Sequence, residues 1–171
     1  ALETGVKTVY LLRHATAQPG NANTADFDRP LADNGVENAH TLNQFLITHA
    51  LHFKNIHCSS ALRTRQTHDL VLQGVCGDRQ SEFSEQIYHA CDDSIVELIK
   101  KQANTDCEIL IIGHNPTIHR VYERLSRTTV AEYPPGTLAA LSSVGSWCDI
   151  TTSPCVSEYF LTPYKLSKSV V

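Results

Sequence analysis

The sequence contains no Met, a single Trp and only 19% charged residues among its 171 positions. Lys and Arg are outnumbered by Asp and Glu, and the resulting net charge of −4 argues against general binding to nucleic acids or membrane surfaces. No apolar run approaches the length of a membrane span. With 42% hydrophobic residues, the composition is that of an ordinary globular protein.

The N-terminal segment also lacks the features of a signal peptide, which are a basic stretch and a following apolar core. Because the sequence begins with Ala and contains no Met, we expect this end to be processed, trimmed or incompletely represented. A removed signal peptide therefore stays an open alternative.

The six cysteines show no C-x-x-C spacing, so no zinc site is expected from them. They could form three disulfides, but several lie beside apolar runs, where a free thiol behaves as a small hydrophobe. We favour reduced thiols in the core and a cytoplasmic location.

Apolar and amphipathic segments alternate along the chain, which predicts a single α/β domain over residues 1–171. Buried strands are expected at 6–12, 55–58 and 108–113. Helices are expected at 33–50, 62–74, 94–103 and 115–126, with Asp33 and Ser94 in capping positions. Residues 81–91 are expected to be irregular or extended. Further strands at 137–144, 146–152 and 157–162 indicate an antiparallel edge. The predicted fold class is therefore a three-layer α/β/α arrangement, a mainly parallel sheet with helices on both faces.

Three of the predicted strands end beside side chains that suit an anion. Arg13 and His14 follow the apolar residues that open "YLLRHATA", Arg63 ends "CSSALR", and His114 follows "EILIIG". Because ligands of an open parallel sheet bind outside the carboxyl ends of its strands, these four side chains are expected to meet at one edge. Charged groups there cost free energy unless an anion meets them.

Two arginines and two imidazoles suit phosphoryl transfer. A neutral imidazole can attack phosphorus and form a phosphohistidine, while arginines bind phosphate oxygens and disfavour protonation of the imidazole. The helix after His114 would add backbone N–H donors, and Asn115 would either bind phosphate or cap that helix. This chemistry requires no metal, and no cofactor is expected.

These segments resemble the histidine phosphatase superfamily, which includes phosphoglycerate mutases and acid phosphatases. "LLRHATA" is similar to its Arg-His-Gly signature, "CSSALRTRQT" to its Ser-Ser-x-Leu-x-Arg segment, and "ILIIGHNPTI" to its second-histidine strand end. The resemblance implies a phosphoglycerate mutase-like fold, His14 as the nucleophile, and Arg13, Arg63 and His114 around the phosphoryl group. The short chain, "DRPLADNG" and "YHACDDSIVELI" look most like SixA-type phosphohistidine phosphatases.

The sequence departs from the family pattern at four positions: Ala15 replaces a glycine, Ala61 a proline and Thr64 an alanine, and Ala32 stands where a capping Thr often opens the first helix. It also lacks the long insertion that supplies a lid in mutases, because the run from Arg63 to His114 is short. We therefore expect a shallow, open site.

The family resemblance places a proton donor in "FSEQIY", where Glu85 is the candidate. Glu82, Asp92 and Asp93 are rivals. A phosphoramidate leaves more easily than an alkoxide, so a weak or absent acid is also compatible with the predicted chemistry.

The leading interpretation is a hydrolase that dephosphorylates phosphohistidine on a signalling protein of the histidine-phosphotransfer type. A phosphatase of a small phosphorylated metabolite and a phosphohistidine-binding pseudo-enzyme are the alternatives. Among the remaining candidates, Arg29 is expected to fix its loop by pairing with Asp26 or Asp28, His119 could line the pocket rim, and Trp147 is expected in the core.

Overall fold

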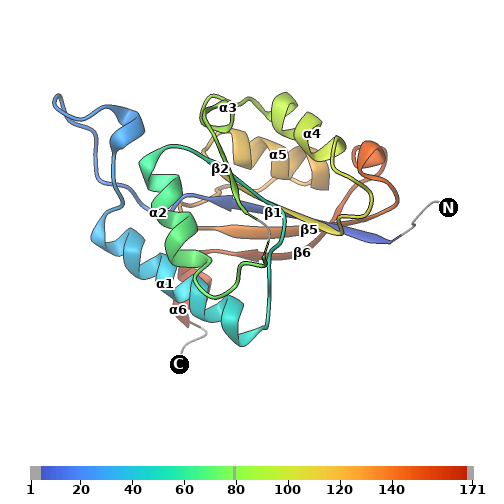
Figure 1. The fold of residues 1–171 in the computed structure, drawn as a ribbon, viewed down its shortest axis with the longest axis horizontal. Coiled ribbons are helices and arrows are strands. Elements are labelled where there is room, and N and C mark those ends of the chain that lie inside the picture. Colours follow the sequence, from blue (N-terminus) through green and yellow to red (C-terminus); the bar gives the residue numbers. More distant parts are fainter. Residues whose placement is uncertain (1–4, 79, 169–171) are drawn as a thin grey trace.

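A six-stranded sheet lies between two layers of helices in the computed structural model, which describes residues 5–78 and 80–168 (Figure 1). The strand order is β3-β2-β4-β1-β5-β6. Neighbours among β1 to β4 run parallel, whereas β5 and β6 are antiparallel to the strands beside them. The predicted α/β class with an antiparallel edge is therefore confirmed. The strands are β1 Val6–Arg13, β2 Ile56–Ser59, β3 Glu82–Ser84, β4 Glu108–Gly113, β5 Leu138–Val144 and β6 Val156–Leu161.

The central strands are buried on both faces, which explains why the sequence predicts them well. Leu11 and Leu12 of β1 point to opposite faces and are both fully buried, as are Ile111 and Ile112 of β4. Strands of this kind appear as continuous apolar runs rather than as alternating patterns. Burying each such side chain contributes about 1.5–3 kcal/mol to folding.

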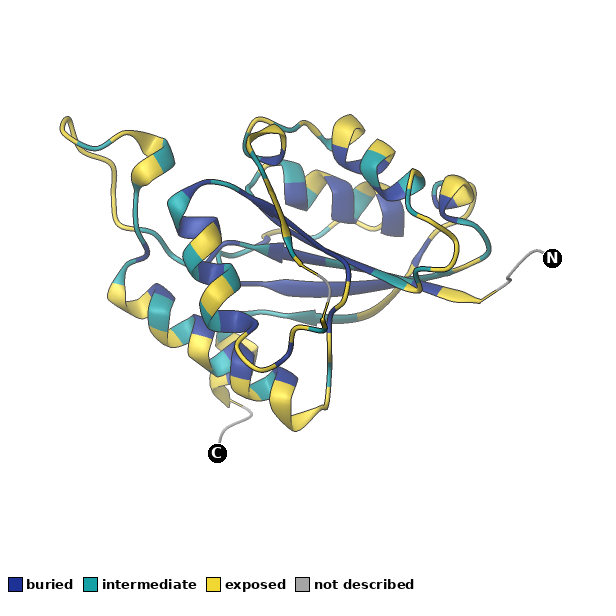
Figure 2. Ribbon diagram, viewed as in Figure 1, coloured by how far each residue is buried: buried dark blue, intermediate teal, exposed yellow. Residues whose placement is uncertain are grey.

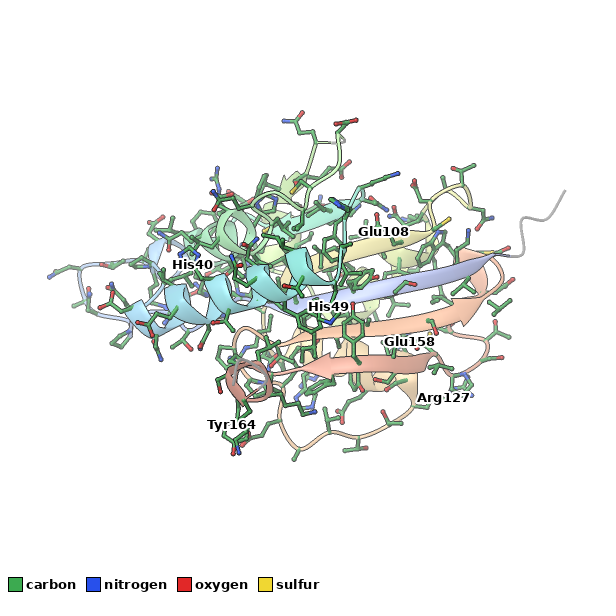
Figure 3. The ribbon with its side chains drawn as sticks, turned by 90° about the horizontal axis from the view of Figure 1, so that it is seen from below. His40, His49, Glu108, Arg127, Glu158 and Tyr164 are labelled. Carbon is green, nitrogen blue, oxygen red and sulfur yellow. The ribbon has the colours of Figure 1, made fainter. Side chains whose placement is uncertain are left out.

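Helices cover both faces of the sheet. One layer contains α1 (Asp33–Thr48), α2 (Leu62–Val71) and α6 (Pro163–Lys168), and the other contains α3 (Glu85–Tyr88), α4 (Asp92–Lys100) and α5 (Thr117–Ser126). Figure 2 shows the strands buried and the outward faces of the helices exposed. His40 lies on α1 and His49 directly follows the end of that helix (Figure 3), and both are exposed.

The predicted strand at 146–152 is wrong. Trp147–Asp149 form a short 3-10 helix, η2, instead. Trp147 and Ile150 are three residues apart, the spacing of a helical turn, and this places both in the core. Trp147 is buried as expected, and its indole N–H donates to the Asp106 carbonyl at 2.8 Å.

Other observed helices and strands differ from the predicted ones by about one turn. Residues 81–91, expected to be irregular or extended, contain the strand β3 and the helical turn α3. Ser84 caps α3 by accepting a hydrogen bond from the Gln86 N–H at 3.0 Å. The capping box at α4 joins Cys91 to Ser94 and not Ser94 to Glu97. The second helix ends at Val71, before Gly74, and α6 was not expected from the sequence.

The cysteines only partly follow the prediction. All six are free thiols, but Cys58 and Cys155 alone are buried, while the other four are exposed. No helix in the described part of the chain is long and apolar enough to cross a membrane.

Candidate active site

The fold brings the four predicted residues to the carboxyl ends of neighbouring strands. Arg13 ends β1 and His14 follows it, His114 follows β4, and Arg63 lies in the first turn of α2, just after β2. β4 pairs in parallel with both β1 and β2, so the three strand ends lie side by side. The ring centroids of His14 and His114 are 5.3 Å apart. Figure 1 shows β1 ending on the side of the sheet where the long loop to α1 projects.

His14 is oriented by its own backbone neighbour. Its Nδ1 lies 2.7 Å from the Ala15 carbonyl oxygen, which can only accept, so Nδ1 carries the hydrogen and Nε2 keeps the lone pair. The residue is only 8% exposed. Burial, with the charges of Arg63, Arg13 and Arg29, lowers the His14 pKa to about 4, although the hydrogen bond to the Ala15 carbonyl opposes this change. At neutral pH, His14 is therefore a neutral imidazole.

His114 is held by a serine that the sequence analysis did not single out. Its Nε2 lies 2.7 Å from the Ser59 hydroxyl, which also accepts a hydrogen bond from the Ala61 N–H at 3.3 Å. The buried Nδ1 has no hydrogen-bond partner among the described residues. Burial, together with His14 and Arg63, lowers the His114 pKa to about 3.

Both arginines are anchored from outside the pocket. Arg13 donates through Nη1 to the Tyr133 carbonyl at 2.9 Å. Arg63 donates through Nη1 to the Asp26 carbonyl at 2.7 Å and through Nη2 to the Asp26 carboxylate at 3.1 Å. The Nε atom of each arginine is buried and has no acceptor within the described chain. Burial and the charge of Arg63 lower the pKa of Arg13, a sign that the two cations are close together. The arrangement suits a ligand with several anionic oxygens.

Asn115 does not cap α5. The N-cap of that helix is Pro116, with no side-chain hydrogen bond. The Asn115 amide donates instead to the Tyr133 carbonyl at 3.1 Å, the same oxygen that anchors Arg13. Its Oδ1 is buried and finds no donor in the described part of the protein.

The loop between β1 and α1 closes one side of the site through a 3-10 turn, η1 (Asp26–Asp28). The Asp26 carboxylate accepts from the Tyr88 hydroxyl at 2.6 Å and from Arg29 Nε at 3.0 Å, besides Arg63. Arg29 also donates to the Gln18 carbonyl at 2.8 Å, so its predicted role in fixing the loop is confirmed. The sequence hinted at the Asp26–Arg29 pair, but neither the contact with Arg63 nor that with Tyr88 had a sequence signal.

Backbone contacts fix the segment that follows His14. The Ala15 N–H donates to the Thr67 hydroxyl at 3.0 Å, and the Thr16 carbonyl accepts from the Ala32 N–H at 2.9 Å. Gly35 of α1 approaches this segment so closely that a Cβ there would lie 2.1 Å from the Thr16 oxygen. The start of α1 therefore holds the segment that follows His14 in place.

Two departures from the family pattern are accommodated. Ala15 is fully buried, and its N–H donates to the Thr67 hydroxyl. Thr64 donates through its hydroxyl to the carbonyls of Ser59 and Ala61, at 2.8 and 2.7 Å, and so stabilises the turn between β2 and α2.

The predicted acids lie on three different elements, β3, α3 and α4. Glu85 begins α3 and its side chain is exposed, three residues before Tyr88, whose ring packs edge-on against His114. Glu82 lies 3.3 Å from His57, while Asp92 and Asp93 pair with Arg124. The role of Glu85 as proton donor stays a prediction. His119 lines a hollow beside Arg13, Asn115 and Tyr133. Among the described residues, no group of three or more His, Cys, Asp or Glu could hold a metal ion.

Comparison with known proteins gives matches to one family. The sequence profile of the histidine phosphatase superfamily (branch 1) matches residues 9–94. An uncharacterised protein of Mycobacterium tuberculosis is 30% identical over 150 residues, which cover 81% of this chain and 91% of the relative.

Two solved structures extend the match over the whole fold. The provisionally assigned phosphohistidine phosphatase SixA of Nakamurella multipartitia superposes with a TM-score of 0.80 and 28% identity, over 93% of this chain and 97% of that one. A phosphoglycerate mutase of Bacillus anthracis gives a TM-score of 0.67 and 18% identity, over 99% of each chain. The fold is therefore phosphoglycerate mutase-like, and the protein is similar to SixA.

Proposed function

Because this chain belongs to the histidine phosphatase superfamily, we propose that it hydrolyses protein phosphohistidine through a phosphorylated intermediate on His14. The observation that carries this proposal is the neutral, buried His14 beside His114 and two anchored arginines. An imidazole with its lone pair on Nε2 is a nucleophile, and the surrounding groups suit a phosphoryl group.

In the first step, the lone pair of His14 Nε2 attacks phosphorus and forms a P–N bond. The bond from phosphorus to the leaving group breaks, and its electron pair stays on the leaving atom. Arg13, Arg63 and His114 stabilise the charge on the phosphoryl oxygens. The Ala15 carbonyl, through Nδ1, stabilises the positive charge that develops on the His14 ring.

In the second step, water attacks the phosphorus of phospho-His14. The P–N bond breaks, its electron pair returns to Nε2, and the proton lost by water goes to solvent or to the released phosphate. His14 returns to its neutral form. Asn115 is proposed to assist by holding Arg13 through their shared acceptor on Tyr133.

The substrate class is proposed from the shape of the chain around the site. Among the described residues, the segment between α2 and β4 contains β3, α3 and α4 and no long insertion that would cover the pocket. A phosphate on a protein side chain is thereby favoured over a free small metabolite. The similarity to a structure named SixA phosphohistidine phosphatase supports the same choice. The proposed partner is a phosphorylated protein of the histidine-phosphotransfer type, and no nucleic-acid or membrane partner is proposed.

The test compares His14→Ala with His40→Ala, since His40 is an exposed histidine of α1 (Figure 3). With phosphoimidazole and a phosphorylated histidine-phosphotransfer domain, His14→Ala is expected to reduce kcat by at least about a thousandfold, whereas His40→Ala retains wild-type rates. Rapid quenching of the wild type should trap acid-labile, base-stable phosphate on the protein. Wild-type rates in His14→Ala would overturn the mechanism. Preference for small phosphorylated metabolites in a competition assay would overturn the substrate class.

A further inference from the structure

Asp26 lies on the solvent side of the phosphate-binding arginine. Its backbone oxygen and its carboxylate both accept from the terminal nitrogens of Arg63. The Arg63 side chain is 7% exposed and that of Asp26 is 54% exposed, so Asp26 contacts the buried guanidinium and is itself open to solvent. In an in-line displacement the leaving group departs opposite the nucleophile. Because a phosphorylated side chain of a partner protein enters from solvent, its leaving group is expected on an exposed side of the site, where Asp26 can reach it.

The carboxylate of Asp26 is ionised and keeps the capacity to accept another hydrogen bond. Its three described donors are Tyr88, Arg63 and Arg29, whereas a carboxylate offers about four acceptor positions. The hydrogen bond from Tyr88, followed by those from the two arginines, lowers the Asp26 pKa to about 2. Asp26 therefore cannot supply a proton near neutral pH, but it can accept a hydrogen bond from a cationic group.

Aromatic rings surround this carboxylate. The Tyr88 ring packs edge-on against Phe27, with centroids 5.1 Å apart, and against His114, with centroids 5.4 Å apart. Phe27 and Tyr88 are both half-buried, so part of each ring remains accessible. An acceptor beside flat apolar surfaces suits a small aromatic ring that carries an N–H.

Phosphohistidine presents such a ring. When the P–N bond of the substrate breaks, its electron pair goes to the substrate nitrogen that carried the phosphoryl group. If the other ring nitrogen holds a proton, the leaving group is a neutral imidazole rather than an imidazolide anion. An ionised carboxylate that accepts from this N–H stabilises the protonated substrate, and no acid from the enzyme is then required.

We propose that Asp26 is a specificity residue that accepts a hydrogen bond from the non-phosphorylated ring nitrogen of the substrate imidazole. This inference rests on the phosphohistidine function proposed above. Asp26 lies outside the four-residue pocket, and in this role it distinguishes substrates by their leaving group.

The test measures kcat/KM of Asp26→Asn with two substrates. Phosphoimidazole has a second ring nitrogen, whereas 4-nitrophenyl phosphate has none. Loss of the charged contact to Arg63 is expected to affect both substrates, by about threefold. Loss of the hydrogen bond to the ring N–H is expected to lower the phosphoimidazole value by a further tenfold or so. The matched control is Asp28→Asn, an exposed aspartate of the same η1 turn, which should leave the ratio of the two values unchanged.

An equal loss with both substrates would overturn the proposal, because Asp26 would then act only by positioning Arg63. An unchanged Asp26→Asn variant would also overturn it. The phosphohistidine function itself would fail in another way: the wild-type protein would hydrolyse 4-nitrophenyl phosphate but not phosphoimidazole. Circular dichroism and thermal melting of Asp26→Asn establish that the variant is folded in each case.

Discussion

Arg13 and Arg63 are each anchored by acceptors that lie outside the pocket, the Tyr133 carbonyl and Asp26. A guanidinium that is already fixed loses little conformational freedom when phosphate binds, so more of the contact energy appears as affinity. The anchoring also holds two like charges together, which burial alone would oppose. The site is therefore preorganised for an anion, and the open chemical question at this scale is how the leaving group departs.

Substitution of Glu85 addresses that question. A proton donor matters most when the leaving group is a strong base, so Glu85→Gln separates substrates by leaving group if Glu85 has that role. We expect a loss of about tenfold or more with an alkyl phosphate and of less than about twofold with phosphoimidazole, measured as kcat. Glu82→Gln is the control, because Glu82 pairs with His57. Equal rates for Glu85→Gln and wild type on an alkyl phosphate would remove Glu85 from the mechanism.

At the scale of elements, the sequence predicted what local pattern and burial determine. The strands β1 and β4 appear as apolar runs, and Arg13, His14 and His114 directly end or follow them, so their convergence could be foreseen from parallel pairing. The pattern failed where long-range packing decides the structure, as at Trp147, whose apolar neighbours suggested a strand. The contacts of Ser59 with His114, and of Asp26 with Arg63 and Tyr88, could not be predicted, because they join segments far apart in the chain.

The contact between α1 and the segment after His14 gives a prediction for Gly35. In a helix, Gly→Ala ordinarily stabilises a protein by about 0.5–1 kcal/mol. Here the added Cβ would overlap the Thr16 carbonyl, so Gly35→Ala is expected to destabilise the fold by about 1–3 kcal/mol and to lower kcat by displacing His14. Urea unfolding and the phosphatase assay measure the two effects. Gly20→Ala, in the loop between β1 and α1, is the control, since its Cβ would make only an ordinary 3.7 Å contact with Arg29. A stabilised Gly35→Ala would contradict the close approach.

At the scale of the whole molecule, an acidic chain of net charge −4 folds around a small cationic site. That site holds two histidines that stay neutral in the folded protein, with pKa values of about 4 for His14 and about 3 for His114. In the unfolded chain both titrate near their ordinary value of about 6.5. Folding and protonation are therefore linked.

The sign of this linkage follows from proton counting. Between about pH 4 and 6.5, the unfolded state binds protons that the folded histidines do not, so the free energy of unfolding falls as the pH is lowered. Each histidine contributes a slope of up to about 1.4 kcal/mol per pH unit. Because the folded pKa of Asp26 is about 2, its contribution is lost only below this range.

Between pH 5 and 6, His14 and His114 together contribute part of the slope of unfolding free energy against pH. We expect His114→Gln to remove about half of that part. Urea titrations in buffers free of phosphate and sulfate measure it, since a bound anion would add stability of its own. His40→Gln, at an exposed position of α1, should retain the wild-type slope (Figure 3). A His114→Gln slope equal to that of the wild type would mean that His114 is protonated in the folded protein. His14 and His114 would then not both be neutral, which contradicts the site on which the proposed mechanism rests.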